Sequence, residues 1–153
     1  MSDQTDIDAI VRALYASIGF PPGGAPDYER LRKLFVPGAR MYPPSDDGDL
    51  VESLELERFF EMSRRAIAGS PALSERGFHE SEVARRTEAY ASIAQVFSTY
   101  EARHSPDDAD PMSRGINSIQ LVRREGKWWV LTMAWDDESP QTPLPARYRE
   151  TPR

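Results

Sequence analysis

One acidic residue stands where proton-transfer chemistry would need it. Asp136 follows directly on the apolar run "WWVLTMAW", residues 128–135, at the end of an expected strand. A carboxylate at the dry end of an apolar pocket has its pKa raised towards neutrality, where it can exchange a proton with a ligand. Asp136 is therefore the first candidate catalytic residue. The alternative is that Asp136, with Asp137 and Glu138 after it, only marks where a strand meets water.

The two histidines of the chain, His79 and His104, both lie at ends of expected strands. His79 is the second candidate catalytic residue, because imidazole titrates near neutrality; it needs a partner that orients its ring, and without one it is a surface residue. Alternation along the strand puts Glu80 and Glu82 on the face opposite His79, which argues against a metal cluster. With no cysteine and no phosphate loop or dinucleotide fingerprint, we expect no metal and no cofactor.

Composition restricts the class of protein. A chain of 153 residues can bury a core of its own, and 39% hydrophobic with 29% charged residues is typical of a globular protein. The net charge of -6 disfavours a nucleic-acid partner, whose phosphates attract clustered Lys and Arg. No apolar run approaches the roughly 20 residues of a membrane span, and the acidic N-terminus is unlike a secretory signal. We therefore expect a cytoplasmic protein that binds neither nucleic acid nor membrane.

The first half of the chain predicts three helices that must position these residues. Apolar side chains recur at spacings of three and four in each of them. The expected helices span residues 7–18, 27–36 and 54–69. Thr5 is the expected N-cap of the first helix and Ser53 that of the third, which should end before Pro71. A brief strand is expected at residues 39–44.

The second half predicts a sheet. Residues 78–103 hold β-branched and aromatic residues in alternating patterns and indicate two long strands. For the first of them a helix over "SEVARRTEAYA", residues 81–91, is the alternative. A hairpin follows, in which residues 114–124 and 127–135 are joined by Glu125 and Gly126, because glycine takes the positive φ of a tight turn. The tail, residues 139–153, is rich in proline and has too few apolar residues for a core. Helices followed by antiparallel strands predict an α+β fold, a strongly curved sheet wrapped around three N-terminal helices as a cone.

The chain resembles a known superfamily in "LRKLFVPGARMYPP", "LELERFF", "IAQVFSTYEAR" and "RGINSIQLVRREGKWWVLTMAW". It is similar there to the nuclear transport factor 2-like proteins, in their SnoaL-like branch of small bacterial proteins. The resemblance covers residues 5–138 and implies a cone-shaped, cystatin-like domain, residues 1–138, with a pocket at its open end. It also implies dimerisation through the outer face of the sheet. Members include ketosteroid isomerase, scytalone dehydratase and polyketide cyclases, so the fold alone names no reaction.

The last expected strand is apolar on both faces. A two-residue turn pairs Arg124 with Lys127, and counting along the hairpin then pairs Asn117 with Ala134. One face then holds Trp128, Val130, Thr132 and Ala134. The other holds Trp129, Leu131, Met133 and Trp135. In the superfamily the tryptophan of the Gly-x-Trp element usually points towards the helices, which assigns the first face to the interior and the second to a homodimer interface.

The pocket mouth is expected to combine side chains of the hairpin with aromatic residues around it. The expected ligand-pocket residues are Tyr15, Tyr42, Phe60, Tyr100, Asn117 and Thr132. Ketosteroid isomerases use a first-helix tyrosine to donate a hydrogen bond to an oxyanion, which makes Tyr15 a candidate. This chain departs from them, since no aspartate stands at the end of its second helix to act as base. Core packing is the alternative role of Tyr15.

Three functions follow from this sequence. The first is a homodimeric, cofactor-free domain that binds a small, largely apolar molecule in the cone. The second is a cofactor-independent acid–base enzyme of the isomerase, dehydratase or cyclase type, in which Asp136 or His79 moves a proton. The third is a protein-interaction module whose cone is filled by Phe60, Tyr100 and other aromatic residues. An open pocket with two facing titratable groups favours the second function, and an open pocket without them favours the first.

Overall fold

A curved sheet with helices on one side forms the molecule. The computed structural model describes residues 2–45 and 53–152. Within these residues six strands form one sheet in the order β2-β1-β6-β5-β4-β3, antiparallel except for the parallel pair β1 and β6. The elements are α1 (Ile7–Ile18), α2 (Tyr28–Arg32), β1 (Phe35–Tyr42), β2 (Leu54–Glu55), α3 (Leu56–Ala68), α4 (Pro71–Arg76), β3 (His79–Tyr90), β4 (Ile93–Arg103), β5 (Ser113–Arg124), β6 (Lys127–Asp137) and the 3₁₀ turn η1 (Ala146–Tyr148).

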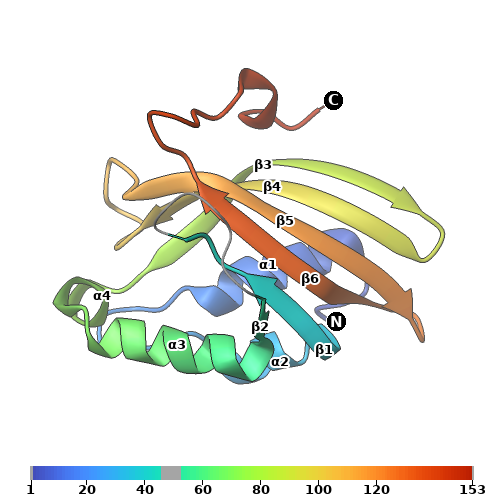
Figure 1. Cartoon of the computed structure of the whole chain (residues 1–153), viewed down its shortest axis with the longest axis horizontal. Coiled ribbons are helices and arrows are strands. Elements are labelled where there is room, and N and C mark those ends of the chain that lie inside the picture. The colour runs from blue at the N-terminus through green and yellow to red at the C-terminus, as the bar shows by residue number, and fades with distance from the viewer. Residues whose placement is uncertain (1, 46–52, 153) are drawn as a thin grey trace.

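Helices α1, α2 and α3 lie on the concave side of the sheet, and the C-terminal segment lies on the other side (Figure 1). This arrangement confirms the predicted α+β fold with a mostly antiparallel sheet around the N-terminal helices. The sheet stays open, because β2 and β3 are its two edges. No helix in the described part of the chain is long and apolar enough to cross a membrane.

Helix α1 forms where the sequence predicts it and turns an apolar face towards the sheet. Ile10 and Leu14, one helical turn apart, are buried in the core. Its N-cap is Asp6, whose side chain accepts a hydrogen bond from the backbone N–H of Ala9 at 2.7 Å. The predicted cap, Thr5, is wrong by one residue. Aspartate caps at least as well as threonine, and its charge also interacts favourably with the positive end of the helix dipole.

The second helix is shorter than predicted, because the chain enters a strand at Phe35. Helix α2 ends at Arg32, and Pro37 and Gly38 lie inside β1 rather than before it. The register of β1 against β6 shifts between Phe35 and Arg40, and Gly38 has a positive φ of 79° within this shift. An irregular stretch of strand accommodates a proline that has no N–H to donate.

The boundaries of the next two helices also differ from the prediction. The expected N-cap Ser53 accepts a hydrogen bond from the side chain of Arg40 at 2.7 Å instead, and α3 begins three residues later at Leu56. Helix α4 was not predicted. Its N-cap is Ser70, and Pro71, expected to end the preceding helix, occupies its first turn. Proline is favourable at that position because an N–H there would have no partner within the helix.

The two long strands and the hairpin form as predicted, and the two long strands also pair with each other. Strands β3 and β4 pair along nearly their whole lengths, and β5 and β6 are joined at Glu125 and Gly126. These two residues have positive φ values of 53° and 75°. Positive φ at both central residues matches the twist of the flanking strands, and it lets a two-residue turn close with Arg124 opposite Lys127.

The predicted register fails halfway along this second hairpin. Leu121 faces Val130 as expected, but Gln120 then faces Thr132, so that Leu131 is an extra residue on β6. Such a bulge exchanges the two faces for all residues beyond it. A sequence that is apolar on both faces carries no signal of the bulge, because either register buries apolar side chains.

Because of the bulge, the predicted faces of β6 are wrong for the residues after Leu131. Met133 and Trp135, assigned to a dimer interface, turn inwards: Met133 is buried in the core and Trp135 packs against it. Thr132 and Ala134, assigned to the interior, belong to the outer face. Trp128 stays inside as predicted.

The outer face of the sheet is partly covered by the chain itself. Leu144 is buried, with 7% of its surface exposed, and the ring of Tyr148 lies 5.6 Å from that of Phe97 on β4. The hydroxyl of Thr99 donates a hydrogen bond to the carbonyl of Tyr148 at 2.5 Å. The residues after 138 therefore form a strap across one part of the outer face, on the side opposite the helices (Figure 1).

Candidate functional site

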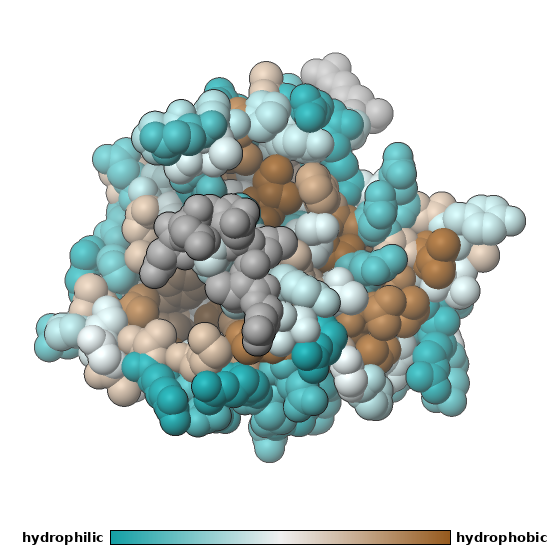
Figure 2. Space-filling view, in the orientation of Figure 1, coloured by the Kyte–Doolittle hydropathy of each residue, from teal (hydrophilic) through white to brown (hydrophobic). Residues whose placement is uncertain are grey.

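A cavity of ≈ 240 Å³ lies between the helices and the concave face of the sheet. Aliphatic and aromatic side chains make up nearly all of its walls, with Phe59 and Phe60 from α3 on one side and Met133 and Trp135 from β6 on another. Figure 2 shows a hollow with apolar residues at its base above helix α3. Phe60 lines this space without filling it, which disfavours the prediction of a cone plugged by aromatic residues.

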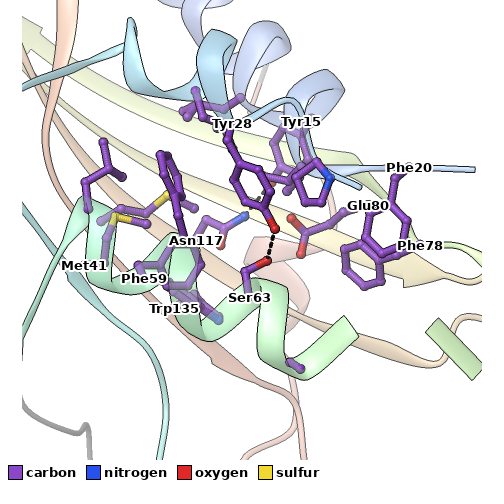
Figure 3. A pocket seen from close by; sticks show the side chains of 18 of the residues that line it. Tyr15, Phe20, Tyr28, Met41, Phe59, Ser63, Phe78, Glu80, Asn117 and Trp135 are labelled. Carbon is purple, nitrogen blue, oxygen red and sulfur yellow. Dashed lines mark hydrogen bonds between the residues drawn. The ribbon is translucent and has the colours of Figure 1, made fainter. Parts of the chain in front are cut away.

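Glu80 brings a carboxylate into these apolar walls from β3 (Figure 3). It lies opposite Ala102 of β4, and strand alternation turns it towards the helices. Burial raises the pKa of Glu80 from 4.5 to about 7; a hydrogen bond from Asn117 acts against this rise, and the charge of Asp137 adds to it. The cavity thus contains a carboxyl group that changes its charge near neutral pH.

Tyr15 lies beside Glu80 but has no hydrogen left for a ligand. Its hydroxyl accepts a hydrogen bond from Nδ2 of Asn117 at 3.1 Å and lies 2.6 Å from the hydroxyl of Ser98. Ser98 donates its single hydrogen to the carboxylate of Glu82, so Tyr15 must be the donor to Ser98. Burial also raises the pKa of Tyr15, which keeps its hydroxyl protonated. Tyr15 therefore orients Asn117 and does not act as the oxyanion donor of a ketosteroid isomerase.

A second polar pair faces the cavity from the helices. The hydroxyl of Tyr28 on α2 and that of Ser63 on α3 lie 2.9 Å apart (Figure 3). Two hydroxyl groups hold two hydrogens, and the bond between them uses one. The pair can therefore donate one hydrogen bond to a ligand.

The predicted catalytic residues lie outside this cavity. Asp136 lies opposite Ile116, beyond the bulge, on the outer face of the sheet, and is exposed. Its carboxylate accepts a hydrogen bond from the backbone N–H of Asp137. His79 lines a polar groove between α1 and β3, together with Arg12 and Arg85, and this groove shares Glu80 and Tyr15 with the cavity. Neither side chain contacts the cavity that the structure forms.

The predicted pocket residues divide into two groups. Tyr15, Phe60 and Asn117 line the cavity, whereas Tyr42, Tyr100 and Thr132 do not. Tyr100 is buried next to it, where its hydroxyl donates to the carboxylate of Asp137. Among the residues predicted for a dimer interface, Met133 and Trp135 line the cavity, while Trp129 and Leu131 are half-buried on the outer face.

Glu80, Tyr28 and Ser63 were missed in the sequence. Alternation separates Glu80 and Glu82 from His79, but the pattern "HESE" has no apolar residue that would mark either face as the interior. Ser63 could have been found, because it follows Phe59 and Phe60 at the helical spacing of four and three residues. Its partner Tyr28 comes from another helix, and that contact is made only when the two helices pack.

Comparisons with known proteins identify the fold. No model of a known protein family matches the sequence, and no curated protein matches it significantly. An uncharacterised protein with a cystatin-like fold from Caulobacter vibrioides has a TM-score of 0.61 at 16% identity, covering 92% of this chain and 93% of that one. An NTF2-like protein of unknown function from Shewanella baltica OS155 has a TM-score of 0.56 at 16% identity, covering 86% and 93%. The CaMKII hub of S. rosetta has a TM-score of 0.54 at 16% identity, covering 85% and 89%.

Proposed function

Because this chain has the nuclear transport factor 2-like fold, and because its cone holds an open cavity, we propose that it binds a small, largely apolar molecule there. The cavity of ≈ 240 Å³ carries this proposal. Pockets for drug-sized ligands measure roughly 300–1,000 Å³, so this one suits a smaller molecule with about one ring. Membership of the SnoaL-like branch and a cytoplasmic location stay predictions.

The few polar groups of the cavity orient such a molecule. Glu80 and Asn117 come from the sheet, and the pair of Tyr28 and Ser63 comes from the helices. A ligand with an apolar body and one polar group gains hydrogen bonds at this end and hydrophobic burial elsewhere. Binding sites for small molecules generally combine an apolar lining with a small number of placed polar groups.

Ligand binding is tested by obstructing the cavity. Ala66 on α3 is exposed but lines the cavity, and the ring of an Ala66→Phe variant would obstruct it from this side. We expect the wild type to bind 2-phenylethanol in ligand-observed NMR and calorimetry, and A66F to lose this binding by tenfold or more. Ala68, exposed at the end of the same helix, provides the matched control Ala68→Phe, which should bind as the wild type does. Absence of binding to the wild type, or equal binding to A66F, contradicts the proposal.

An acid–base enzyme is the second candidate, and the pKa of Glu80 near 7 favours it. A carboxylate with this pKa takes a proton from a ligand and returns it at another position, which is an isomerisation and needs no cofactor. The free hydrogen of the Tyr28 and Ser63 pair stabilises the oxygen on which negative charge develops. Glu80 replaces Asp136 and His79 as the proposed proton carrier, since those two lie outside the cavity.

A homodimer through the outer face is also proposed. Phe97 and Ile93 of β4 are 40% and 56% exposed, and Trp129 and Leu131 are half-buried on the same face. Apolar residues gathered on one face of a sheet commonly mark a protein interface. The strap after residue 138 packs Tyr148 against Phe97 and covers only that part of this face, which leaves Ile93, Trp129 and Leu131 for a partner subunit.

A further inference from the structure

The polar end of the cavity carries a negative group without a positive partner. Glu80 is the only Asp or Glu among the described residues that line the cavity, and no Lys, Arg or His lines it. Two neighbouring carboxylates of the sheet, in contrast, are paired: Glu82 with Arg85 at 2.8 Å and Glu101 with Arg103 at 3.3 Å. Within the described chain Glu80 forms no such ion pair.

Because no cation of the described residues lies beside it, the environment of Glu80 makes its ionised form unfavourable. The only group that favours its ionised form is the amide of Asn117, whereas burial and the charge of Asp137 disfavour it. A buried carboxylate is stable in its charged form only when a cation and hydrogen-bond donors surround it. The protein supplies the hydrogen-bond donor, the amide of Asn117, and a ligand would have to supply the cation.

Aromatic rings around Glu80 fit a cation as well. Figure 3 shows the carboxylate among Tyr28, Phe20 and Phe78, all of which line the cavity. The ring of Tyr28 already holds the guanidinium of Arg64, 4.4 Å from its centre, which leaves Phe20 and Phe78 without a cation from the described part of the protein. The faces of aromatic rings attract ammonium groups, which is how proteins hold quaternary and methylated ammonium ions. A carboxylate or phosphate ligand, in contrast, would meet Glu80 with no basic side chain to bind it.

We propose that the ligand of this cavity is a small hydrophobic amine, bound as its ammonium ion by the carboxylate of Glu80 and the neighbouring aromatic rings. This inference rests on the proposed binding of a small molecule and specifies its chemical class. The ammonium group lies at the polar end, where Asn117 donates to the other side of the carboxylate. The hydrocarbon part occupies the apolar space between α3 and β6.

Ionisation of Glu80 sets the pH at which the amine binds. The titratable groups near Glu80 are Tyr15 on α1, Tyr28 on α2, Tyr100 on β4 and Asp137 on β6. The groove on its other side adds Asp8 and Arg12 from α1 and His79, Glu82 and Arg85 from β3, in which Arg12 pairs with Asp8 and Arg85 with Glu82. Burial raises the pKa of Tyr15 and Tyr100, so both stay neutral at pH 8. An alkylamine keeps its proton up to about pH 10. Amine binding is therefore strongest between the pKa of Glu80, about 7, and that of the amine.

Three probes of matched shape and different charge test this inference. Affinities for 2-phenylethylamine, 2-phenylethanol and phenylacetate are measured by calorimetry at pH 8, and for the amine also at pH 5.5. At pH 8 we expect the amine to bind at least about tenfold more tightly than the alcohol, and phenylacetate to bind most weakly. The ratio of amine to alcohol affinity, the amine preference, should decrease at pH 5.5. In Glu80→Gln the amine should lose tenfold or more while the alcohol changes by less than about threefold. Glu101→Gln removes the same charge from the outer side of β4 and should keep the amine preference.

The outcomes separate this inference from the proposed function. If the alcohol binds as tightly as the amine, or if E80Q keeps the amine preference, the amine inference is overturned and the binding proposal stands. If phenylacetate binds most tightly, Glu80 acts as a neutral acid, and the inference is likewise overturned. If none of the three probes binds to the wild type, the binding proposal fails as well. Binding of the alcohol by E80Q shows that this variant is folded.

Discussion

A single carboxyl group determines the chemistry of this cavity. Glu80 is placed by alternation along β3 and ends among aromatic side chains, where burial makes its charged form less favourable. The hydroxyl of Tyr15 and the amide of Asn117 form one chain of hydrogen bonds from Glu80 to Ser98. Each donor in this chain is committed, so the chain positions Asn117 rather than contacting a ligand through Tyr15.

The raised pKa of Glu80 makes stability depend on pH. The folded state keeps a proton that the unfolded state releases at about pH 4.5, so the stability of the wild type falls as the pH rises from about 4.5 to about 7. The rise in pKa corresponds to about 3 kcal/mol at 1.36 kcal/mol per pH unit. We expect Glu80→Gln to be more stable than the wild type at pH 8, by up to about 3 kcal/mol, and to gain much less at pH 5.

Urea unfolding followed by tryptophan fluorescence at the two pH values measures this difference. Glu101→Gln, which changes the same charge on the opposite face, is the control and should show no pH-dependent gain. An equal gain for E80Q at pH 5 and pH 8 would contradict the assignment of the raised pKa to Glu80.

At the scale of elements, the bulge in β6 decides which side chains reach the cavity. The extra residue Leu131 turns Met133 and Trp135 inwards and Thr132 outwards. The last inward residue of the strand is then Asp137, whose carboxylate accepts the hydroxyl of Tyr100. The hairpin thus ends in a hydrogen bond at the edge of the core, between exposed Asp137 and buried Tyr100.

Gly115 on β5 is required for this contact. A Cβ there would overlap with the carbonyl oxygen of Asp136 and with the hydroxyl of Tyr100, and it would lie 2.7 Å from Cζ of the Tyr100 ring. Because backbone cannot move away as a flexible side chain can, we expect Gly115→Ala to lose about 2 kcal/mol or more of unfolding free energy. Gly69→Ala, where the nearest atom lies 3.3 Å away and φ is helical, should change stability much less. Thermal and urea unfolding compare the variants, and equal losses would contradict this role of Gly115.

At the scale of the whole molecule, two covers are available for the outer face of the sheet. The strap after residue 138 packs Leu144 and Tyr148 onto it beside Phe97. The remaining apolar side chains of β4 and β6 are left for a second subunit. Neighbouring residues of β6 therefore have different roles: Met133 packs in the core, whereas Leu131 lies on the outer face.

This division gives the dimer proposal a paired test. Leu131→Glu places a charge on the outer face, and we expect it to convert a dimer into a monomer while the thermal unfolding of the subunit changes little. Met133→Glu buries a charge in the core and should destabilise the fold itself, by several kcal/mol. Light scattering coupled to size exclusion measures the assembly. A wild type that is monomeric at micromolar concentration, or an L131E variant that still dimerises, would contradict the proposed interface.

The sequence by itself determined the class of fold, the long strands and one hairpin, because these follow from local periodicity and turn chemistry. The resemblance to a known superfamily added three of the cavity residues, Tyr15, Phe60 and Asn117. The alternating strands and the Glu125 and Gly126 turn are confirmed as predicted. Only the tertiary structure decided the chemistry of the site. The bulge at Leu131 removed Asp136 from the interior, and no local pattern marks a bulge in a strand that is apolar on both faces. Glu80 became the central group because burial, and with it the raised pKa, comes from helices distant in the sequence that pack over it.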